Sequence, residues 1–350
     1  MSRMLAKIVK IDSVRKHPNA DTLDLCMVGG WQVVSKAGEY KAGDYAIYCE
    51  VDSFLPVEVA PFLVKGEPKI YNGIVGERLQ SIKLRGELSQ GLLLSIYQFP
   101  AVIAEFHKTR LYVHGRDNSI DVTNILGIVK YEPPIPACLS GVAKGVFPSI
   151  IPKTDEERVQ NLAFEFDSFL SAEWEVSEKL EGSSMTVARL SGEFQVCSRN
   201  LNLLETEGNS LWKVARLNNI EEKMVTLGLD DFVIQGELIG EGIQGNHYGI
   251  KGQELYVFRM YDVKKGKFVD TATRYSICKE LGLKHVPLIN ECVKLSDGLG
   301  ISTVGEVLEY ADGKSLLNPT KLREGVVFKE ISGQRHWKAI SNSYLLKVGG

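Results

Sequence analysis

The sequence predicts an α+β protein of two domains, a small β-barrel followed by a domain of antiparallel sheets with interspersed helices. Three observations support this fold class. The chain of 350 residues is long enough to bury two hydrophobic cores. Its first third contains many short apolar runs separated by turn residues. Prolines and glycines then concentrate between residues 131 and 152, which marks a boundary between domains.

The composition excludes several classes of protein. A formal net charge of −3 provides no overall basic field, so a polyanion has to be bound by a local patch of lysines and arginines. The six cysteines include no C-x-x-C pair, which argues against a zinc site or a disulfide framework and indicates a reducing, intracellular compartment. We expect no signal peptide and no membrane partner, because the N-terminus lacks a long apolar region and no apolar run approaches the ~20 residues of a membrane span.

Residues 1–130 form the predicted barrel. A hairpin is expected around Gly29-Gly30, because apolar runs flank this glycine pair. The run from His17 to Asp21, which reads HPNAD and precedes strands, resembles the OB-fold tRNA-binding domain of some synthetase-associated proteins. This resemblance implies that the barrel is an OB fold. The expected strands are residues 6–12, 23–28, 31–34, 45–49, 79–84 and 92–94.

Two basic residues of this barrel are candidates for contact with nucleic-acid phosphates, Lys83 and Arg85. A solvated strand face explains both equally well. The barrel therefore either binds nucleic acid or only supports its neighbour.

The predicted linker spans residues 131–152, and the second domain spans residues 153–350. Thr154 and Glu157 have capping-box spacing, and apolar residues follow at helical spacing as far as Phe166, so a helix is expected there. Further helices are expected within residues 209–227, at 271–281 and at 302–311. Strands are expected at residues 174–179, 185–190, 194–198, 232–238, 255–263, 326–328 and 337–340.

Lys179 is the leading candidate for a catalytic residue. It ends a short alternating run, is preceded by Glu178, and is followed by Glu181-Gly182. A lysine held partly desolvated beside a glycine turn has a lowered pKa, and the neutral amine is a nucleophile. Taken alone, the motif is more typical of a surface turn with a solvated lysine.

Further motifs follow Lys179 in order along the chain. They are Ser198-Arg199, Gly236-Glu237, Phe258, Glu324-Gly325 with Lys329, and Lys338. The ordered set resembles the covalent nucleotidyltransferase superfamily of polynucleotide ligases and RNA-capping enzymes. It is most similar to the ATP-dependent RNA ligases that carry an N-terminal OB domain.

The resemblance implies a nucleotidyltransferase domain that uses ATP and a divalent metal, Mg²⁺ or Mn²⁺. Lys179 would attack the α-phosphorus of ATP, expel pyrophosphate and carry AMP. Glu237 and Glu324 would position the metal, since Mg²⁺ prefers carboxylate oxygens and water. The remaining residues would bind the nucleotide: Glu178, Leu180, Glu181 and Gly182 around the nucleophile, Arg199 at the ribose or phosphates, Phe258 stacked on adenine, and Lys329 and Lys338 at the α-phosphate.

The sequence departs from the family pattern at two places. Some of these ligases have an aspartate after the stacking phenylalanine, where this chain has Arg259. They also carry a second lysine two positions from the last motif lysine, where this chain has His336 and Ile340. Both departures put the detailed nucleotide contacts in doubt but not the lysyl-AMP chemistry.

Domain order favours an RNA ligase over other members of the superfamily. DNA ligases and capping enzymes usually place an OB domain after the transferase domain, whereas only twelve residues follow Lys338 here. We expect a monomer that joins RNA ends at nicks or splints in duplexes. A minimal DNA ligase remains an alternative, as does an RNA-binding protein with a vestigial transferase domain, although vestigial domains usually lose the charged residues that this chain retains.

Overall fold

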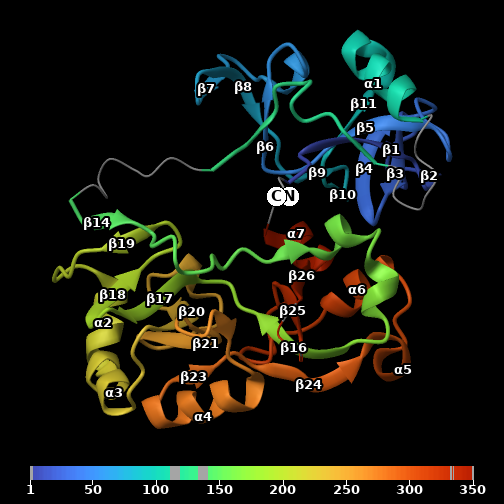
Figure 1. Cartoon of the computed structure of the whole chain (residues 1–350). Helices are drawn as coiled ribbons and strands as arrows, with labels where there is room; N and C mark the ends of the chain where they lie inside the picture. The colour runs from blue at the N-terminus through green and yellow to red at the C-terminus, as the bar shows by residue number, and fades with distance from the viewer. Residues whose placement is uncertain (1–2, 111–118, 133–140, 332, 334, 349–350) are drawn as a thin grey trace. The chain divides into compact units, whose positions relative to one another are not determined.

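A computed structural model describes residues 3–110, 119–132, 141–331, 333 and 335–348. The chain divides into two compact units, coloured from blue to red along the sequence in Figure 1. The first comprises Met1–Pro134, Gln160–Phe164 and Leu345–Gly350, and the second comprises Ile135–Val159 and Glu165–Tyr344. Three prolines of the predicted linker, Pro133, Pro134 and Pro136, lie outside the described residues, as does Cys138.

The first unit is built almost entirely from short strands. They form four ladders, with the orders β11-β5-β1-β12, β13-β6-β8-β7, β2-β3-β4 and β10-β9. The strands are β1 (Ala6–Lys10), β2 (Ser13–Lys16), β3 (Leu23–Val28), β4 (Trp31–Lys36), β5 (Tyr45–Cys49), β6 (Ser53–Pro56), β7 (Lys69–Tyr71), β8 (Ile74–Arg78), β9 (Ile82–Leu84), β10 (Glu87–Ser89), β11 (Leu92–Ser95), β12 (Ile120–Asp121) and β13 (Val129–Lys130). The helical segments are η1 (Pro61–Leu63), η2 (Ile96–Gln98) and α1 (Pro100–Arg110).

Both faces of the central strands in this unit are buried. Ile8 and Ile47 lie in one hydrophobic cluster, whereas Val9 and Tyr48, one position along, lie in another. Successive side chains of a strand point to opposite faces, so β1 and β5 separate two small cores. This arrangement explains why the sequence of β5 is apolar throughout instead of alternating.

Most of the strands expected in this unit form, but the prediction missed several short strands (β2, β6, β7, β8, β10, β12 and β13) and one helix. The strand expected over residues 79–84 starts only at Ile82, and the backbone of Leu79 instead forms hydrogen bonds with Asp52 and Ser53. Helix α1 was not predicted, because Pro100 was not recognised as the first residue of a helix, where its missing N–H costs nothing. Val102 and Phe106, four residues apart, are its buried contacts.

The second unit contains two large sheets. One has eight strands in the order β14-β19-β18-β17-β20-β21-β22, with β23 also paired to β21, and the other has the order β15-β26-β25-β16-β24. The strands are β14 (Ala143–Val146), β15 (Glu157–Arg158), β16 (Glu173–Lys179), β17 (Ser183–Leu190), β18 (Glu193–Cys197), β19 (Leu201–Leu203), β20 (Phe232–Gly240), β21 (Gln253–Asp262), β22 (Lys267–Phe268), β23 (Lys284–His285), β24 (Leu288–Lys294), β25 (Gly325–Glu330) and β26 (His336–Ile340). The helical segments from residue 159 onward are η4 (Val159–Leu162), η5 (Phe166–Phe169), α2 (Ser210–Leu217), α3 (Ile220–Thr226), η6 (Gln244–Asn246), α4 (Thr271–Leu281), α5 (Leu295–Leu299), α6 (Val304–Ala311) and α7 (Asn342–Val348).

The helix expected after Thr154 is wrong. Glu157–Arg158 is instead the strand β15, which pairs in parallel with β26, and only the two short 3₁₀ turns η4 and η5 follow. The hydrogen bonds available from β26 outweigh the local capping signal, which carries no information about that distant strand. Strand β14, which lies within the predicted linker, likewise pairs with β19.

Strand periodicity separates the two faces of the five-stranded sheet. Trp174, Phe328 and Trp337 point to one face, where the rings of Phe328 and Trp337 stack with centroids 4.0 Å apart. The residues directly before and after each of these aromatics in its strand point to the opposite face, because side chains alternate along a strand. This second face carries Glu175, Ser177, Lys179, Val327, Lys329, His336 and Lys338.

The eight-stranded sheet is divided in the same way. Helices α2, α3 and α4 cover one of its faces, against Ile234 and Leu238 of β20 (Figure 1). Gln235 and Glu237 alternate with these residues and therefore point to the other face. The polar residues of both sheets thus gather on faces that the helices and the aromatic cluster leave free.

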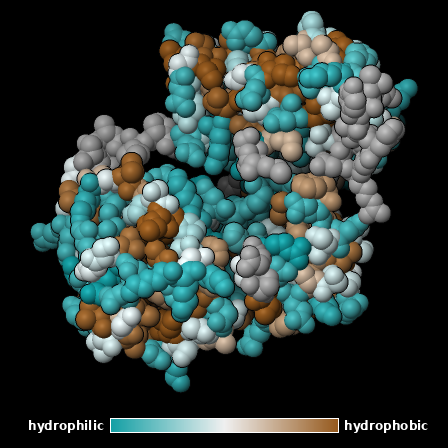
Figure 2. Space-filling model, viewed as in Figure 1, coloured by the Kyte–Doolittle hydropathy of each residue, from teal (hydrophilic) through white to brown (hydrophobic). Residues whose placement is uncertain are grey.

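The viewed surface is mostly hydrophilic, with hydrophobic residues in separate patches (Figure 2). Among the described residues, no helix has both the length and the apolar character needed to cross a membrane. The five described cysteines are free, and four of them are buried.

Candidate active site

Lys179 is the last residue of β16 and lies directly opposite Gly325 at the start of β25. Its Nζ donates a hydrogen bond to Glu324 Oε1 at 2.6 Å. A Cβ at Gly325 would lie only 2.1 Å from the carbonyl oxygen of Ala339, so no other residue fits there without shifting β26. The glycine therefore allows β25 and β26 to approach closely beside the lysine.

Glu237 lies near this ion pair. Burial raises the pKa of the Glu237 carboxyl to about 7; the charge of Lys179 opposes this shift, and the charge of Glu324 adds to it. Gly182 makes the arrangement possible, since a Cβ at this position would lie 2.8 Å from Glu237 Cγ and 2.4 Å from the carbonyl oxygen of Leu238. Two carboxylates thus stand close to one amine.

Lys338 is a second cation near Lys179. Burial, together with the positive charges of Lys179 and Arg158, lowers the pKa of the Lys338 amine to about 8. Arg158 is fixed there because it pairs with Lys338 across the parallel ladder of β15 and β26. This part of the site is therefore an electropositive patch that favours an anion.

Lys329 has its amine bound within the fold. Its Nζ donates to the carbonyl oxygen of Phe258 at 2.8 Å and to Glu175 Oε1 at 3.2 Å. Burial lowers the pKa of Lys329 to about 8. Burial alone would raise the pKa of Glu175, but the charges of Lys329 and Arg274 lower it to about 2. Lys329 thus ties β25 to the strand that carries Phe258.

These groups surround a pocket with an empty volume of about 540 Å³, measured to include the open space at its mouth. It combines an aromatic ring, aliphatic side chains, two lysines and three carboxylates. The residues that line it are Thr154, Glu156, Ser177, Glu178, Lys179, Leu180, Glu237, Phe258, Val286, Val327 and Lys329.

Glu178 contributes a buried carboxylate to the pocket. Its Oε2 accepts a hydrogen bond from the Leu316 N–H at 2.7 Å, whereas its Oε1 has no hydrogen-bond partner among the described residues. Burial raises the pKa of Glu178, against the hydrogen bonds from Ser315 and Leu316. An unpaired buried acceptor is costly, so a donor from a bound molecule would be stabilising here.

A family model for RNA ligases matches residues 172–348, and a model of an OB-fold domain matches residues 5–96. The chain belongs to the RNA ligase family. A mutant Naegleria gruberi RNA ligase with AMP and Mn is 40% identical to it over 99% of both chains, with a TM-score of 0.82. A second mutant of that ligase, with ATP and Mn, and the ligase with PPi are each 40% identical over 99% of both chains, with TM-scores of 0.81. A comparison with curated proteins found no match.

The structure of this RNA ligase brings most of the predicted site residues together. Lys179, Glu178, Leu180, Glu237, Phe258 and Lys329 line one pocket. Glu324 is connected to this group because it accepts the hydrogen bond from Lys179. Lys338 lies close enough for the charges of Lys179 and Glu324 to affect the pKa of its amine. The backbone N–H of Glu181 donates to Tyr248 Oη at 2.6 Å, which fixes the turn after the lysine.

Arg199 does not line this pocket. Its side chain is 61% exposed and forms an ion pair of 2.7 Å with Asp155. Sequence reasoning also missed Thr154, Glu156 and Val286 as pocket residues, because no motif spacing marks them. The polar character of the segment after the proline-rich region was the one available signal.

Proposed function

We propose that this RNA ligase joins a 3′-OH to a 5′-phosphate in three steps that begin with Lys179 and ATP. The neutral Lys179 Nζ attacks the α-phosphorus, a nitrogen–phosphorus bond forms, and pyrophosphate leaves. The 5′-phosphate of RNA then attacks the same phosphorus, which frees the lysine and makes RNA-adenylate. The 3′-OH finally attacks the 5′-phosphate and AMP leaves. The observation that carries this proposal is the position of the Lys179 amine, between carboxylates in a pocket suited to a nucleotide.

The pocket offers adenine an aromatic surface and a hydrogen-bond acceptor. Phe258 supplies a ring on which a base can stack. The unpaired Glu178 Oε1 can accept a hydrogen bond from the exocyclic amino group of adenine. Guanine presents a carbonyl oxygen at the corresponding position, which a carboxylate repels. The buried carboxylate therefore favours ATP over GTP.

Glu237 and Glu324 suit a divalent cation of the Mg²⁺ or Mn²⁺ type. Burial and the charge of Glu324 both raise the pKa of the Glu237 carboxyl, so a cation beside the two carboxylates would be stabilising, and oxygen is the ligand that such ions prefer. No group of three or more His, Cys, Asp or Glu side chains is placed to hold a metal among the described residues, so water and phosphate oxygens have to complete the set. The metal would offset the negative charge of the phosphates.

Basic residues near Lys179 are placed to bind the phosphates of ATP, and Glu324 binds the Lys179 amine. Lys338 and Arg158 place positive charge beside Lys179, where the α-phosphate has to lie. Glu324 holds the Lys179 ammonium until the amine loses its proton. Arg199 is exposed, and we place it at the outer phosphates or the ribose.

The test is covalent labelling. Incubation with ATP labelled at the α-phosphate and Mg²⁺, followed by denaturing electrophoresis, should yield a labelled protein, and addition of nicked RNA duplex should transfer the label and seal the nick. An RNA-binding protein with a vestigial domain would bind RNA but not become labelled. A minimal DNA ligase would become labelled and would seal an all-DNA nick equally well.

The same proposal covers partners and compartment. We expect a monomer that acts on nicked or splinted RNA. The OB domain would span residues 1–130, the linker residues 131–152 and the nucleotidyltransferase domain residues 153–350. The free cysteines support a reducing, intracellular compartment. Sedimentation with and without nicked RNA tests the oligomeric state.

A further inference from the structure

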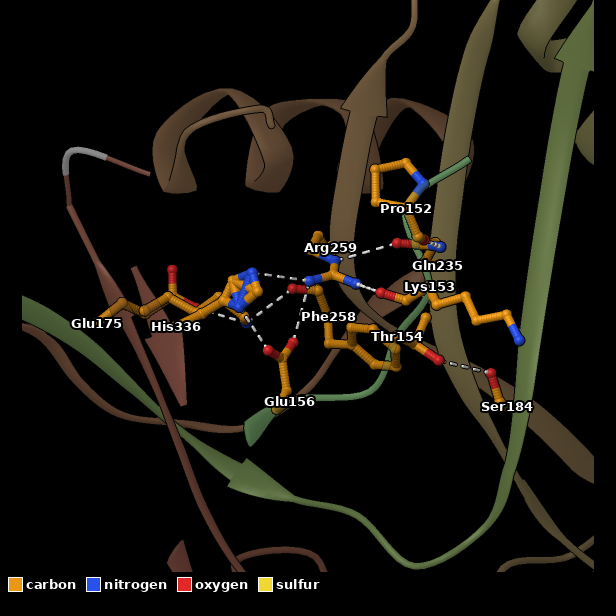
Figure 3. Close-up of polar contacts among 11 residues, drawn as sticks. Pro152, Lys153, Thr154, Glu156, Glu175, Ser184, Gln235, Phe258, Arg259 and His336 are labelled. Carbon is orange, nitrogen blue, oxygen red and sulfur yellow. Dashed lines mark hydrogen bonds and ion pairs between the residues drawn. The ribbon is translucent and has the colours of Figure 1, made fainter. Parts of the chain in front are cut away.

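Arg259 is a buried cation directly behind the pocket. It follows Phe258 on β21 and is 3% exposed. Its guanidinium donates three hydrogen bonds: Nε to Gln235 Oε1 at 3.0 Å, Nη2 to the carbonyl oxygen of Lys153 at 2.7 Å, and Nη1 to Glu156 Oε1 at 3.1 Å (Figure 3). A planar guanidinium presents its donors in fixed directions, so these contacts hold their partners in one geometry.

The contacts anchor the segment 152–156, which forms no regular secondary structure. Gln235 Nε2 donates to the carbonyl oxygen of Pro152 at 2.8 Å, so two consecutive carbonyl groups, those of Pro152 and Lys153, are bound by side chains of β20 and β21. Thr154 and Glu156 of this segment line the nucleotide pocket. Without a strand partner, the position of this wall depends on these side-chain contacts.

His336 joins the same cluster from β26. Its Nδ1 lies 2.6 Å from Glu156 Oε2, and its Nε2 lies 3.5 Å from Arg259 Nη1 (Figure 3). A guanidinium can only donate, so Nε2 is the acceptor of this fourth, longer contact of Arg259, and Nδ1 lies beside the Glu156 carboxylate. Glu156 therefore bridges β21 and β26, and β26 carries Lys338 on the same face as His336.

The cluster includes residues from both departures from the family pattern. Arg259 stands where some related ligases have an aspartate, and His336 is one of the two positions, with Ile340, where a second lysine is expected; the side chains of Arg259 and His336 converge on one carboxylate, Glu156. The change to a cation at position 259 is thus balanced by a buried anion from the pocket wall itself.

We propose that Arg259, Glu156 and His336 form a positioning cluster that holds the segment 152–156 as one wall of the nucleotide pocket and so determines the affinity for ATP. This inference rests on the proposed function. Among the described residues, no hydrogen bond or ion pair joins the cluster to Lys179, so we expect its loss to weaken ATP binding and to leave the rate of adenylyl transfer at saturating ATP nearly unchanged.

The test compares Arg259→Lys and Arg259→Gln in single-turnover formation of lysyl-AMP over a range of ATP concentrations. Lysine keeps a charge beside Glu156 but cannot reach all three acceptors. We expect the ATP concentration at half-maximal rate to rise roughly tenfold with lysine, the loss typical of a hydrogen bond to a charged group, and further with glutamine. The maximal rate should stay within about threefold of wild type, because we expect the substitutions to change the activation free energy of the transfer step by less than ~1 kcal/mol.

Arg335→Lys is the matched control. Arg335 also forms a two-pronged ion pair, with Glu330 at 2.7 and 3.0 Å, and its guanidinium lies 5.2 Å from the centre of the Phe169 ring. None of these three residues lines the pocket, so the ATP dependence should remain that of wild type.

Three outcomes would overturn the inference. An unchanged ATP dependence in Arg259→Lys would mean that Arg259 only neutralises Glu156. A fall in maximal rate with no change in ATP dependence would place Arg259 in the chemical step. If both Arg259 variants fail to fold, His336→Gln is tested in their place, because His336 is only partly buried. A half-maximal ATP concentration for His336→Gln equal to that of wild type would then overturn the inference. The wild-type protein is measured in the same experiment. If it forms no lysyl-AMP, the proposed function is refuted, and this result is distinct from a failure of the inference.

Discussion

Glu178→Gln should reduce the preference of this RNA ligase for ATP over GTP. The carboxylate is buried; its Oε2 accepts from the Leu316 N–H at 2.7 Å, and its Oε1 is unpaired by geometry among the described residues. An amide in this position keeps its carbonyl oxygen on that N–H and turns its NH₂ group into the pocket. The substitution thus converts an acceptor that faces the base into a donor.

The size of the effect follows from that single contact. A hydrogen bond to a charged group contributes about 1.5–3 kcal/mol, so the ATP concentration at half-maximal labelling should rise roughly ten- to 150-fold. GTP should gain, because the new N–H can donate to the carbonyl oxygen of guanine. The fold should not suffer, since burial already disfavours the charged form of Glu178 and the substitution removes that charge.

The assay is covalent labelling by α-labelled ATP and GTP over a concentration range, with thermal unfolding measured in parallel. Glu173→Gln is the control, because it is the same change at the exposed beginning of the same strand. If Glu178→Gln leaves the ratio of ATP to GTP labelling at the wild-type value, the unpaired oxygen does not face the base and the adenine assignment is refuted.

Four further expectations concern the nucleophile, the metal, acid stability and the nick. Lys179→Ala should abolish protein labelling yet still seal RNA with a pre-adenylylated 5′ end; a labelled mutant would show that another residue carries AMP. Glu237→Gln and Glu324→Gln should each need more Mg²⁺ for half-maximal labelling, and a wild-type Mg²⁺ titration in either mutant would remove that residue from the metal site. The pKa of Glu175 is lowered from 4.5 to about 2, so its ion pair with Lys329 contributes stability above pH ~4.5 that is lost as the pH falls toward 2, of the order of 3 kcal/mol; Glu175→Gln should flatten the acid limb of the unfolding free energy, and an unchanged limb would contradict the assignment. Finally, a nick with a ribonucleotide at its 3′ terminus should seal faster than an all-DNA nick, because a site that binds a 2′-hydroxyl rejects its absence; equal rates would favour a minimal DNA ligase.

The sequence by itself determined the class of the fold, the order of most elements and the family. Turn residues separate the short strands of the first unit, and alternation along β16 and β20 assigns each side chain to a face. The motif around Lys179 was readable because its glycine and carboxylates are close in sequence. Turns, strand alternation and short motifs can be recognised in the sequence because local backbone geometry depends on neighbouring residues.

Features that depend on residues far apart in the sequence became visible only in the folded structure. Glu157–Arg158 became a strand instead of a helix because β26 offered it hydrogen bonds. Lys329, predicted at the α-phosphate, has its amine on Glu175 and the carbonyl of Phe258 in this structure.

The cluster behind the pocket is the clearest case. In the sequence, Arg259 and His336 appeared only as departures from a pattern, and Glu156 only as part of the polar segment after the proline-rich region. The fold brings the three together from separate strands and a loop, where the buried charges of Arg259 and Glu156 offset each other and His336 contacts both side chains. A buried ion needs a partner within a few ångströms, and the sequence positions of these residues give no measure of that distance.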